Sequence, residues 1–357
     1  MKRVGFISLG NLYLCPYLQA YLHELEQPYT VIFWDREQRM EEPPAGCTYF
    51  RFESTKLVST MDKLHGYRSF RRYIKRILKE HSFDVLVLLQ TAAAVLISDI
   101  LVKEYPNRYI VDIRDYSVEG NPLLFRIEKN IISHSMQTVI SSEGYKSFLP
   151  ERPYLIAHNL QRLSNEKVAE IRKSSVRKEQ LNIAFIGYVN YHEQHKKILL
   201  QLKNDPRFHL TFIGTRAEEL SSFCNANGIN NVTLRGRFEP DDILGLYQSV
   251  NLINNLYGNH TPTLDYALSN KLYFAAELHI PILVCPGTFM ESVSKQYHIG
   301  CTVDLDKPGA ADVIYSFYNN IAWDEFKAGC TMFLNKVKNE QAVFTSTVKK
   351  AFSEATD

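Results

Sequence analysis

Short runs of apolar residues alternate along the chain with longer stretches in which apolar residues recur every three or four positions. The runs are typical of buried strands, and the stretches are typical of helices that pack on a sheet. In the first half, the runs predict strands at residues 3–8, 29–34, 85–89, 109–112, 138–141 and 154–157. Helices are predicted there at residues 16–25, 67–81, 92–105, 122–135 and 142–148.

A polar and charged segment at residues 161–180 separates this half from a second series of the same kind. Strands are predicted in the second series at residues 182–186, 209–213, 231–235, 250–254, 282–285 and 300–303. Helices are predicted at residues 195–204, 217–228, 240–248, 270–278 and 290–297, with a last helical stretch at 326–351. Strands that alternate with helices indicate an α/β fold around parallel sheets.

The length of 357 residues suits two domains, since single cores rarely grow beyond about 250–300 residues. We therefore predict two Rossmann-like, doubly wound domains that face a central cleft. Residues 1–160 form the first domain, 161–180 a linker and 181–325 the second domain. Residues 326–357 are predicted as C-terminal helices that pack back across both domains.

Composition narrows the class of protein. With 45% hydrophobic and 22% charged residues the chain is ordinary for a globular protein, and a net charge of +2 is too small for a dedicated nucleic-acid binder. Six cysteines without metal-like spacing indicate reduced thiols and a cytoplasmic protein. The apolar N-terminus superficially resembles a signal peptide, but Asn11 and Pro16 interrupt it. No apolar run reaches the roughly 18 residues that span a bilayer.

Glycine residues end two predicted strands of the second half. Gly187 follows the strand at 182–186, and Lys196 and Lys197 come at the start of the next helix. Gly214 follows the strand at 209–213 and is followed by Thr215 and Arg216. Glycine lets a ligand approach the backbone closely, and a helix N-terminus attracts anions. Ordinary turn glycines and solvated cations are the alternative interpretation.

The loop from Tyr257 to Thr263 contains small and hydroxyl-bearing residues that can cradle a diphosphate. The helix after it starts at Ser269-Asn270-Lys271, so Lys271 lies within reach of an anion at the positive helix end. A second loop, which contains Thr288, precedes another helix N-terminus. A capped surface helix with a solvated lysine is the alternative. The predicted donor-binding residues of these loops are Thr261, Pro262, Thr263, Ser269, Asn270 and Thr288.

In the first half, polar residues gather at predicted strand ends on one rim. Asp112 ends the fourth strand and Arg114 and Asp115 follow it, where two carboxylates around a cation suit sugar hydroxyls or general-base chemistry. An internal salt-bridge cluster is the alternative. Two further strand ends on the same rim carry Gly10, Asn11 and Glu143.

The predicted helix at 67–81 has an apolar stripe and a basic remainder. A basic amphipathic helix can lie on an anionic membrane surface, whereas an ordinary core-packed helix with a solvated face is the alternative. The cations of this face are Arg68, Arg71, Arg72, Lys75, Arg76 and Lys79. On this basis we expect a cytoplasmic protein that can associate with the inner face of the plasma membrane.

The chain resembles bacterial glycosyltransferases of the GT-B architecture, in the retaining group that builds capsular and O-antigen polysaccharides. The resemblance rests mainly on SNKLYFAAELHIPILV (269–284) and PGTFMESVSKQYHIG (286–300), with weaker matches in DIRDY and TVISSEGYKSFLP. Such enzymes bind a nucleotide sugar with the second domain and a saccharide or lipid-linked oligosaccharide with the first. They use neither a metal nor a cofactor, because basic side chains and helix dipoles stabilise the leaving diphosphate.

Carried onto this chain, the resemblance implies that Lys271, with Lys196 or Arg216, contacts the diphosphate and that Asp115 and Arg114 face the acceptor. We predict Asp115 and Lys271 as catalytic residues, and Asp112, Arg114, Gly10, Asn11 and Glu143 as acceptor-binding residues. Gly187, Asn190, Lys196, Gly214, Thr215 and Arg216 complete the predicted donor site. Two positions depart from the family. Phe274 replaces a Glu that binds the nucleotide ribose, and Asn190 stands near a position usually held by Arg.

The sequence thus predicts a glycosyltransferase that acts on a lipid-linked oligosaccharide in surface polysaccharide synthesis. A non-catalytic partner of another transferase is an alternative, which Phe274 motivates, and a nucleotide-sugar epimerase of the same architecture is another. No GxGxxG follows the first strand of either domain, which argues against a dinucleotide oxidoreductase.

Overall fold

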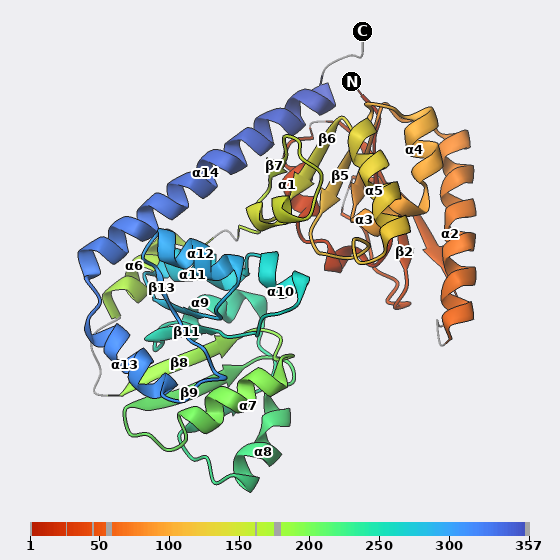
Figure 1. Ribbon diagram of the computed structural model, residues 1–357. Coiled ribbons are helices and arrows are strands. Elements are labelled where there is room, and N and C mark those ends of the chain that lie inside the picture. Colours follow the sequence, from red (N-terminus) through yellow and green to blue (C-terminus); the bar gives the residue numbers. More distant parts are fainter. Residues whose placement is uncertain are drawn as a thin grey trace. The chain divides into compact units, whose positions relative to one another are not determined.

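The computed structural model describes residues 2–25, 27–44, 46–54, 59–160, 163–174 and 180–353 (Figure 1). The chain divides into two compact units. Unit 1 comprises residues 1–159 and 339–357, and unit 2 comprises residues 160–338.

Unit 1 contains a seven-stranded parallel sheet in the order β3-β2-β1-β4-β5-β6-β7. Its strands are β1 (Val4–Ser8), β2 (Tyr29–Asp35), β3 (Thr48–Glu53), β4 (Val85–Leu89), β5 (Tyr109–Ile113), β6 (Gln137–Ile140) and β7 (Leu155–Ile156). Its helices are η1 (Leu12–Leu14), α1 (Leu18–Leu22), α2 (Thr60–Glu80), α3 (Thr91–Leu96), α4 (Ser98–Glu104), α5 (Pro122–His134) and η2 (Glu143–Ser147).

Unit 2 repeats this arrangement with six parallel strands in the order β10-β9-β8-β11-β12-β13. The strands are β8 (Leu181–Ile186), β9 (Phe208–Ile213), β10 (Val232–Arg235), β11 (Leu252–Asn255), β12 (Ile282–Val284) and β13 (Gly300–Thr302). The helices before β11 are α6 (Asn165–Ser174), α7 (His192–Gln201), η3 (Ala217–Leu220), α8 (Ser221–Ala226), η4 (Pro240–Asp242) and α9 (Ile243–Leu246). After β11 come α10 (Pro262–Tyr266), α11 (Asn270–Leu278), α12 (Phe289–Gln296), α13 (Ala310–Asn319) and α14 (Trp323–Ser353).

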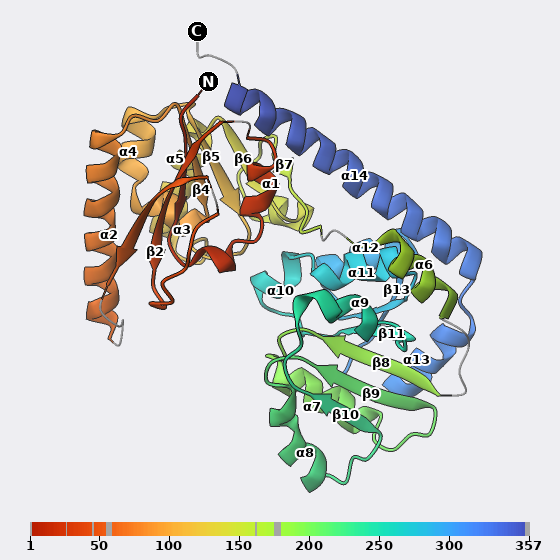
Figure 2. The same ribbon diagram turned by 180° about the vertical axis from the view of Figure 1, so that it is seen from behind.

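Helices cover both faces of each sheet, as Figures 1 and 2 show for each unit. In unit 1, α1 and the end of α14 pack on one face through Tyr21, Phe344 and Phe352. In unit 2, α6, α9, α11 and α12 cover one face, and α7, α8 and α13 cover the other. The predicted fold class, two Rossmann-like α/β domains, is therefore confirmed.

Several predicted elements differ from the observed ones. Helix α2 begins seven residues before its predicted start, because Ser59 and Asp62 form a capping box at Thr60. The helix predicted at 92–105 is interrupted at Ile97, which gives α3 and α4. The predicted linker at 161–180 contains α6, whose Val168 and Ile171 are buried in the core of unit 2, while residues 161, 162 and 175–179 lie outside the described residues.

Strand β3 and helix α13 have no counterpart in the prediction. Helix α14 begins at Trp323 and extends to Ser353. Its first half contributes Phe326 and Phe333 to the core of unit 2. Its second half contributes Phe344 and Val348 to the core of unit 1.

Candidate functional site

Both sheets have a topological switch point, where successive connections leave in opposite directions. In unit 2 this point lies between β8 and β11, and in unit 1 between β1 and β4. In open α/β sheets, ligands bind beyond the carboxyl ends of the strands at such a point. A ligand site in each unit is therefore expected at the loops that follow these strands.

Two glycines shape the switch point of unit 2. Gly187 follows β8 and Gly214 follows β9, and both have a φ of +137°, a conformation that favours glycine. A Cβ atom at Gly214 would lie 1.8 Å from the carbonyl oxygen of Gly187, so the two strand ends are in close contact. The backbone conformation and the contact between the strand ends therefore explain glycine at these positions, independently of any ligand.

Lys271 brings a buried positive charge to this place. Ser269 caps α11 by accepting a hydrogen bond from the Lys271 backbone N–H at 3.3 Å. The Lys271 side chain is only 6% exposed, and a Cβ atom at Gly187 would lie 3.4 Å from its Nζ. Nζ donates a hydrogen bond to the Tyr257 hydroxyl at 2.7 Å. Among the described residues, no carboxylate lies within 4 Å of this ammonium.

Aromatic rings surround the Lys271 ammonium instead. Nζ lies 4.2 Å from the ring centre of Phe185 and 5.1 Å from that of Tyr257. The His195 ring packs edge-to-face against the Phe185 ring, with ring centres 4.6 Å apart. Burial, together with the positive charges of His192 and Lys271, lowers the pKa of His195 to about 3, so His195 is neutral. Lys271 is therefore a desolvated cation whose charge nothing in the described part of unit 2 neutralises.

Arg216 and Asn190 lie together, but Lys196 does not join them. Arg216 pairs with Glu219 at 2.9 Å and donates to the Asn190 side-chain oxygen at 2.8 Å. Lys196 pairs with Glu193 at 2.7 Å and lies over the Phe223 ring. Thr215 contributes its backbone carbonyl to the loop after β8, accepting from the Val189 N–H.

The predicted donor-binding residues in the loops after β11 and β12 differ in how far they are exposed and in what they contact. Thr261 and Thr263 are exposed at the start of α10, and Thr261 makes no side-chain capping bond. Pro262 occupies the first turn of α10, and Asn270 is exposed at the start of α11. Thr288 is 5% exposed; its hydroxyl caps α12 and donates to the Cys285 carbonyl, so this side chain serves the fold.

Phe274 is part of the core. It is 5% exposed and stacks on Tyr247, with ring centres 5.0 Å apart and an angle of 27° between the planes. The family resemblance implies a ribose-binding Glu at this position, and the structure has an aromatic pair of the core there.

Gln194 is a residue that the sequence analysis missed. A Cβ atom at Gly258 would lie 3.3 Å from the Gln194 amide nitrogen, so this side chain lies against the loop that follows β11. Its position in the sequence could have indicated this, because Gln194 stands in the first turn of the helix that follows the strand-ending Gly187.

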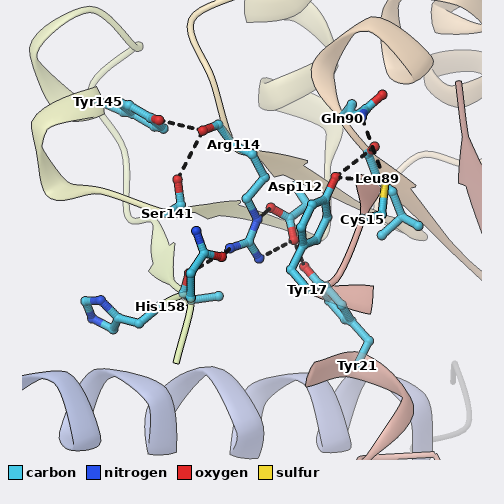
Figure 3. A network of polar contacts seen from close by, with 12 residues as sticks. Cys15, Tyr17, Tyr21, Leu89, Gln90, Asp112, Arg114, Ser141, Tyr145 and His158 are labelled. Atoms are coloured by element: carbon cyan, nitrogen blue, oxygen red, sulfur yellow. Dashed lines mark hydrogen bonds and ion pairs between the residues drawn. The ribbon is translucent and has the colours of Figure 1, made fainter. Parts of the chain in front are cut away.

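In unit 1, the Asp112–Arg114 pair is an internal network (Figure 3). Arg114 donates two hydrogen bonds to Asp112, at 2.5 and 2.8 Å, and others to the Ala157 carbonyl and Asn159. Its guanidinium also lies 4.2 Å from the ring centre of Tyr17. Asp112 is fully buried and Arg114 is 9% exposed.

Tyr21 completes the network by donating to Asp112 at 2.7 Å. The salt-bridge alternative therefore describes both predicted residues better than acceptor binding does.

The other residues predicted on the rim of unit 1 are of two kinds: some pair with a neighbouring side chain, and others are not paired. Asn11 is fully buried and donates to Asp35 at 2.7 Å, while Glu143 pairs with Lys146 at 3.0 Å. A Cβ atom at Gly10 would lie 4.0 Å from Cδ of Arg36, so this glycine has open space beside it in the described structure. Asp115 is exposed and has no hydrogen bond or ion pair among the described residues; surrounding atoms desolvate it and raise its pKa, against the effect of Arg114.

Gln90 is a second residue that the sequence did not reveal. It directly follows β4, with φ 135° and ψ 142°, a region that costs a non-glycine residue about 1–3 kcal/mol. Its amide donates to the Cys15 sulfur at 3.8 Å (Figure 3). Backbone strain of this kind clusters at functional sites, and this one lies at the switch point of unit 1.

Within the described residues, no group of three or more His, Cys, Asp or Glu side chains is arranged to hold a metal ion. No described helix is both long enough and apolar enough to cross a bilayer.

No protein-family model matches the sequence, and no curated protein matches it either. Solved structures do match over nearly the whole chain. Sucrose-phosphate synthase from Thermosynechococcus elongatus superposes with a TM-score of 0.72 at 11% identity, over 99% of this chain and 100% of that one. WaaG, a glycosyltransferase involved in lipopolysaccharide biosynthesis, gives a TM-score of 0.64 at 10% identity, over 99% and 100%.

HepE from Anabaena, solved with UDP and glucose, gives a TM-score of 0.61 at 14% identity, over 98% of each chain. Similarity at these identities concerns the fold. The chain therefore has the two-domain, Rossmann-like fold of the GT-B glycosyltransferases.

Proposed function

We propose that this protein is a glycosyltransferase that moves a sugar from a nucleotide-sugar donor to a saccharide acceptor. Unit 2 binds the donor and unit 1 binds the acceptor. The observation that carries the proposal is the Lys271 ammonium, which is buried beside Gly187 with no carboxylate in the described residues to neutralise it. A buried charge is costly unless something pairs with it, and a diphosphate at the N-terminus of α11 would be that partner.

In this proposal, Lys271 stabilises the negative charge that develops on the leaving diphosphate. Charge stabilisation in a desolvated place is stronger than in water, so a single ammonium is effective there. Asn190 follows β8 and Arg216 follows β9, and this hydrogen-bonded pair adds a second contact. The fold neighbour HepE was solved with UDP-glucose, which supports a nucleotide sugar as the donor class.

On the acceptor side, we assign Asp115 as the residue that faces the sugar hydroxyl. It is the exposed, unpartnered carboxylate of the DIRDY segment in the described structure, and its raised pKa brings it closer to the range that suits a general base. Following the family resemblance, we further propose retention of configuration and a lipid-linked oligosaccharide as acceptor, in surface polysaccharide synthesis.

Replacing Lys271 tests the proposal. Isothermal titration of the wild type with UDP, GDP, ADP and CDP should show binding of at least one of them. For that ligand we expect Lys271→Ala to weaken binding about tenfold or more, because hydrogen bonds to charged groups contribute about 1.5–3 kcal/mol. With the full nucleotide sugar, kcat/KM should fall at least tenfold, which is about 1.4 kcal/mol.

Lys203→Ala is the matched control, since Lys203 is an exposed lysine of the same unit, and it should bind like the wild type. If the wild type binds none of the four nucleotides, the alternative of a non-catalytic partner is favoured, for which Phe274 is the supporting residue. If a donor is converted without any acceptor, the protein is an epimerase.

A further inference from the structure

The hydroxyl group of Tyr257 has an orientation that its hydrogen bond determines. An ammonium group can only donate, so in the 2.7 Å contact between Lys271 Nζ and the Tyr257 oxygen the phenol is the acceptor. The phenolic proton must then point away from the ammonium. No acceptor for this proton is found among the described residues. Tyr257 therefore presents a donor beside the donors of Lys271.

The two donors can meet one ligand group. Their heavy atoms are 2.7 Å apart, so neighbouring oxygens of one phosphate group can each accept from one of them. Gly187 leaves the space beside Nζ open, since a Cβ atom there would stand 3.4 Å from it. Anionic oxygens are the acceptors that suit an ammonium and a phenol.

The surrounding rings keep this pair in place without cancelling its charge. Phe185 is fully buried on β8, and its ring lies edge-to-face with that of Tyr257 at 5.5 Å. The Tyr191 ring also packs edge-to-face on the Tyr257 ring, with ring centres 4.8 Å apart. Cation–π contacts stabilise an ammonium by about 0.5–2 kcal/mol, whereas a carboxylate would neutralise it and compete with the ligand.

We propose that Lys271 and Tyr257 form a two-donor clamp for one phosphate group of the donor diphosphate, with Tyr257 as a binding residue in its own right. This inference rests on the proposed function and extends it by naming the second donor. A phosphate fits the clamp because two of its oxygens can accept, one from each group, while the remaining oxygens stay free for backbone N–H donors.

The test compares Tyr257→Phe with the wild type in titrations with inorganic pyrophosphate and with the nucleoside diphosphate that the wild type binds. The substitution keeps the ring, so the melting temperature should stay within about 2 °C. Binding of both phosphate ligands should weaken about tenfold, while binding of the corresponding nucleoside should be unchanged. Tyr315→Phe is the control, because it removes a hydroxyl from α13, where the ring packs on Phe208.

A double-mutant cycle then tests whether the two donors act together. If both donors contact one phosphate group, Lys271→Ala combined with Tyr257→Phe should weaken pyrophosphate binding by less than the product of the single effects. Unchanged phosphate binding by Tyr257→Phe, with Lys271→Ala still defective, would overturn the clamp and leave the proposed function standing. A wild type that binds neither nucleoside diphosphates nor pyrophosphate would overturn both.

Discussion

Lys271 and Lys196 belong to the same unit, and their surroundings differ in a way that has physical consequences. Lys196 pairs with Glu193 on its own helix and is partly exposed to water, where an ion pair contributes little. Lys271 is buried among aromatic rings, so its charge acts through a low dielectric. The same residue type is therefore a surface charge at one position and a candidate anion ligand at the other.

Glu128 is a second buried ionisable residue, and it gives a prediction about pH. It is 1% exposed on α5, and neither carboxylate oxygen has a hydrogen-bond partner in the described structure. Burial and then the charge of Glu119 raise its pKa from 4.5 to about 8, against a smaller effect of Thr91. The folded protein therefore holds this proton more tightly than the unfolded chain does.

The sign of the effect follows from linkage. This residue's contribution to stability is complete below about pH 4.5 and is lost as the pH rises toward about 8. Glu128→Gln keeps the shape but does not ionise, so it should melt at the same temperature as the wild type near pH 4.5. At pH 8.5 the variant should be more stable by about 1–3 kcal/mol, since a tenfold change in proton affinity corresponds to about 1.4 kcal/mol.

Thermal melts of both proteins between pH 4.5 and 8.5 measure this difference. Glu80→Gln, which removes an exposed carboxylate from the same unit, should show no such trend. A constant gap between Glu128→Gln and the wild type at all pH values would mean that Glu128 is ionised throughout the range.

At the scale of elements, α2 shows how an amphipathic pattern divides between the core and the solvent. Its apolar stripe packs into unit 1, with Phe70, Ile74 and Ile77 buried, so this stripe serves the fold. Arg71 pairs with Asp99 at 2.7 Å, which removes one cation from the predicted membrane-binding set. The cations of this predicted set that stay exposed on α2 are Arg68, Arg72, Lys75, Arg76 and Lys79.

We predict that this basic face binds anionic membranes. A triple variant, Arg72→Gln with Lys75→Gln and Arg76→Gln, should bind vesicles containing phosphatidylglycerol at least tenfold more weakly, because each surface cation contributes about 1 kcal/mol. A variant with three exposed lysines of unit 2 changed to Gln, at Lys203, Lys307 and Lys327, has the same net charge and should bind like the wild type. Equal binding by both variants in a vesicle sedimentation assay would exclude a specific role for α2.

The elements that the sequence predicted well are those with a clear apolar pattern. Buried strands such as β4 and β8 are continuous apolar runs, and their predicted places are confirmed. Strand β3 was missed because its residues are mostly part-exposed and carry Arg51 and Glu53 in place of an apolar run. The break between α3 and α4 at Ile97 has no local sequence signal and depends on how both helices pack on α5.

Part of the candidate site could also be predicted, where a local sequence pattern determines the position of a residue. Lys271 follows a helix cap that is visible in the sequence, so its position could be predicted. Its neighbours could not, because Phe185 reads only as an apolar strand residue and reaches Lys271 through the packing of β8 against α11. The internal role of Arg114 likewise depends on Tyr17 and Asn159, which are distant in sequence.

At the scale of the whole molecule, the two units share one topology. In each, the first strand lies between later strands on both sides, which places a switch point beside β1 in unit 1 and beside β8 in unit 2. The topology thus determines where a ligand can bind, while individual side chains determine which ligand it is. Lys271, Tyr257 and Gly187 meet at one of these points, and Asp115 and Gln90 lie at strand ends of the other sheet.

The most direct test of the central claim is a crystal structure of the protein soaked with UDP or GDP. We predict a diphosphate beyond the carboxyl ends of β8 and β11, with a phosphate oxygen within about 3.2 Å of Lys271 Nζ. A nucleotide bound elsewhere, or a Lys271 ammonium that stays without an anion at saturating nucleotide, would contradict the account.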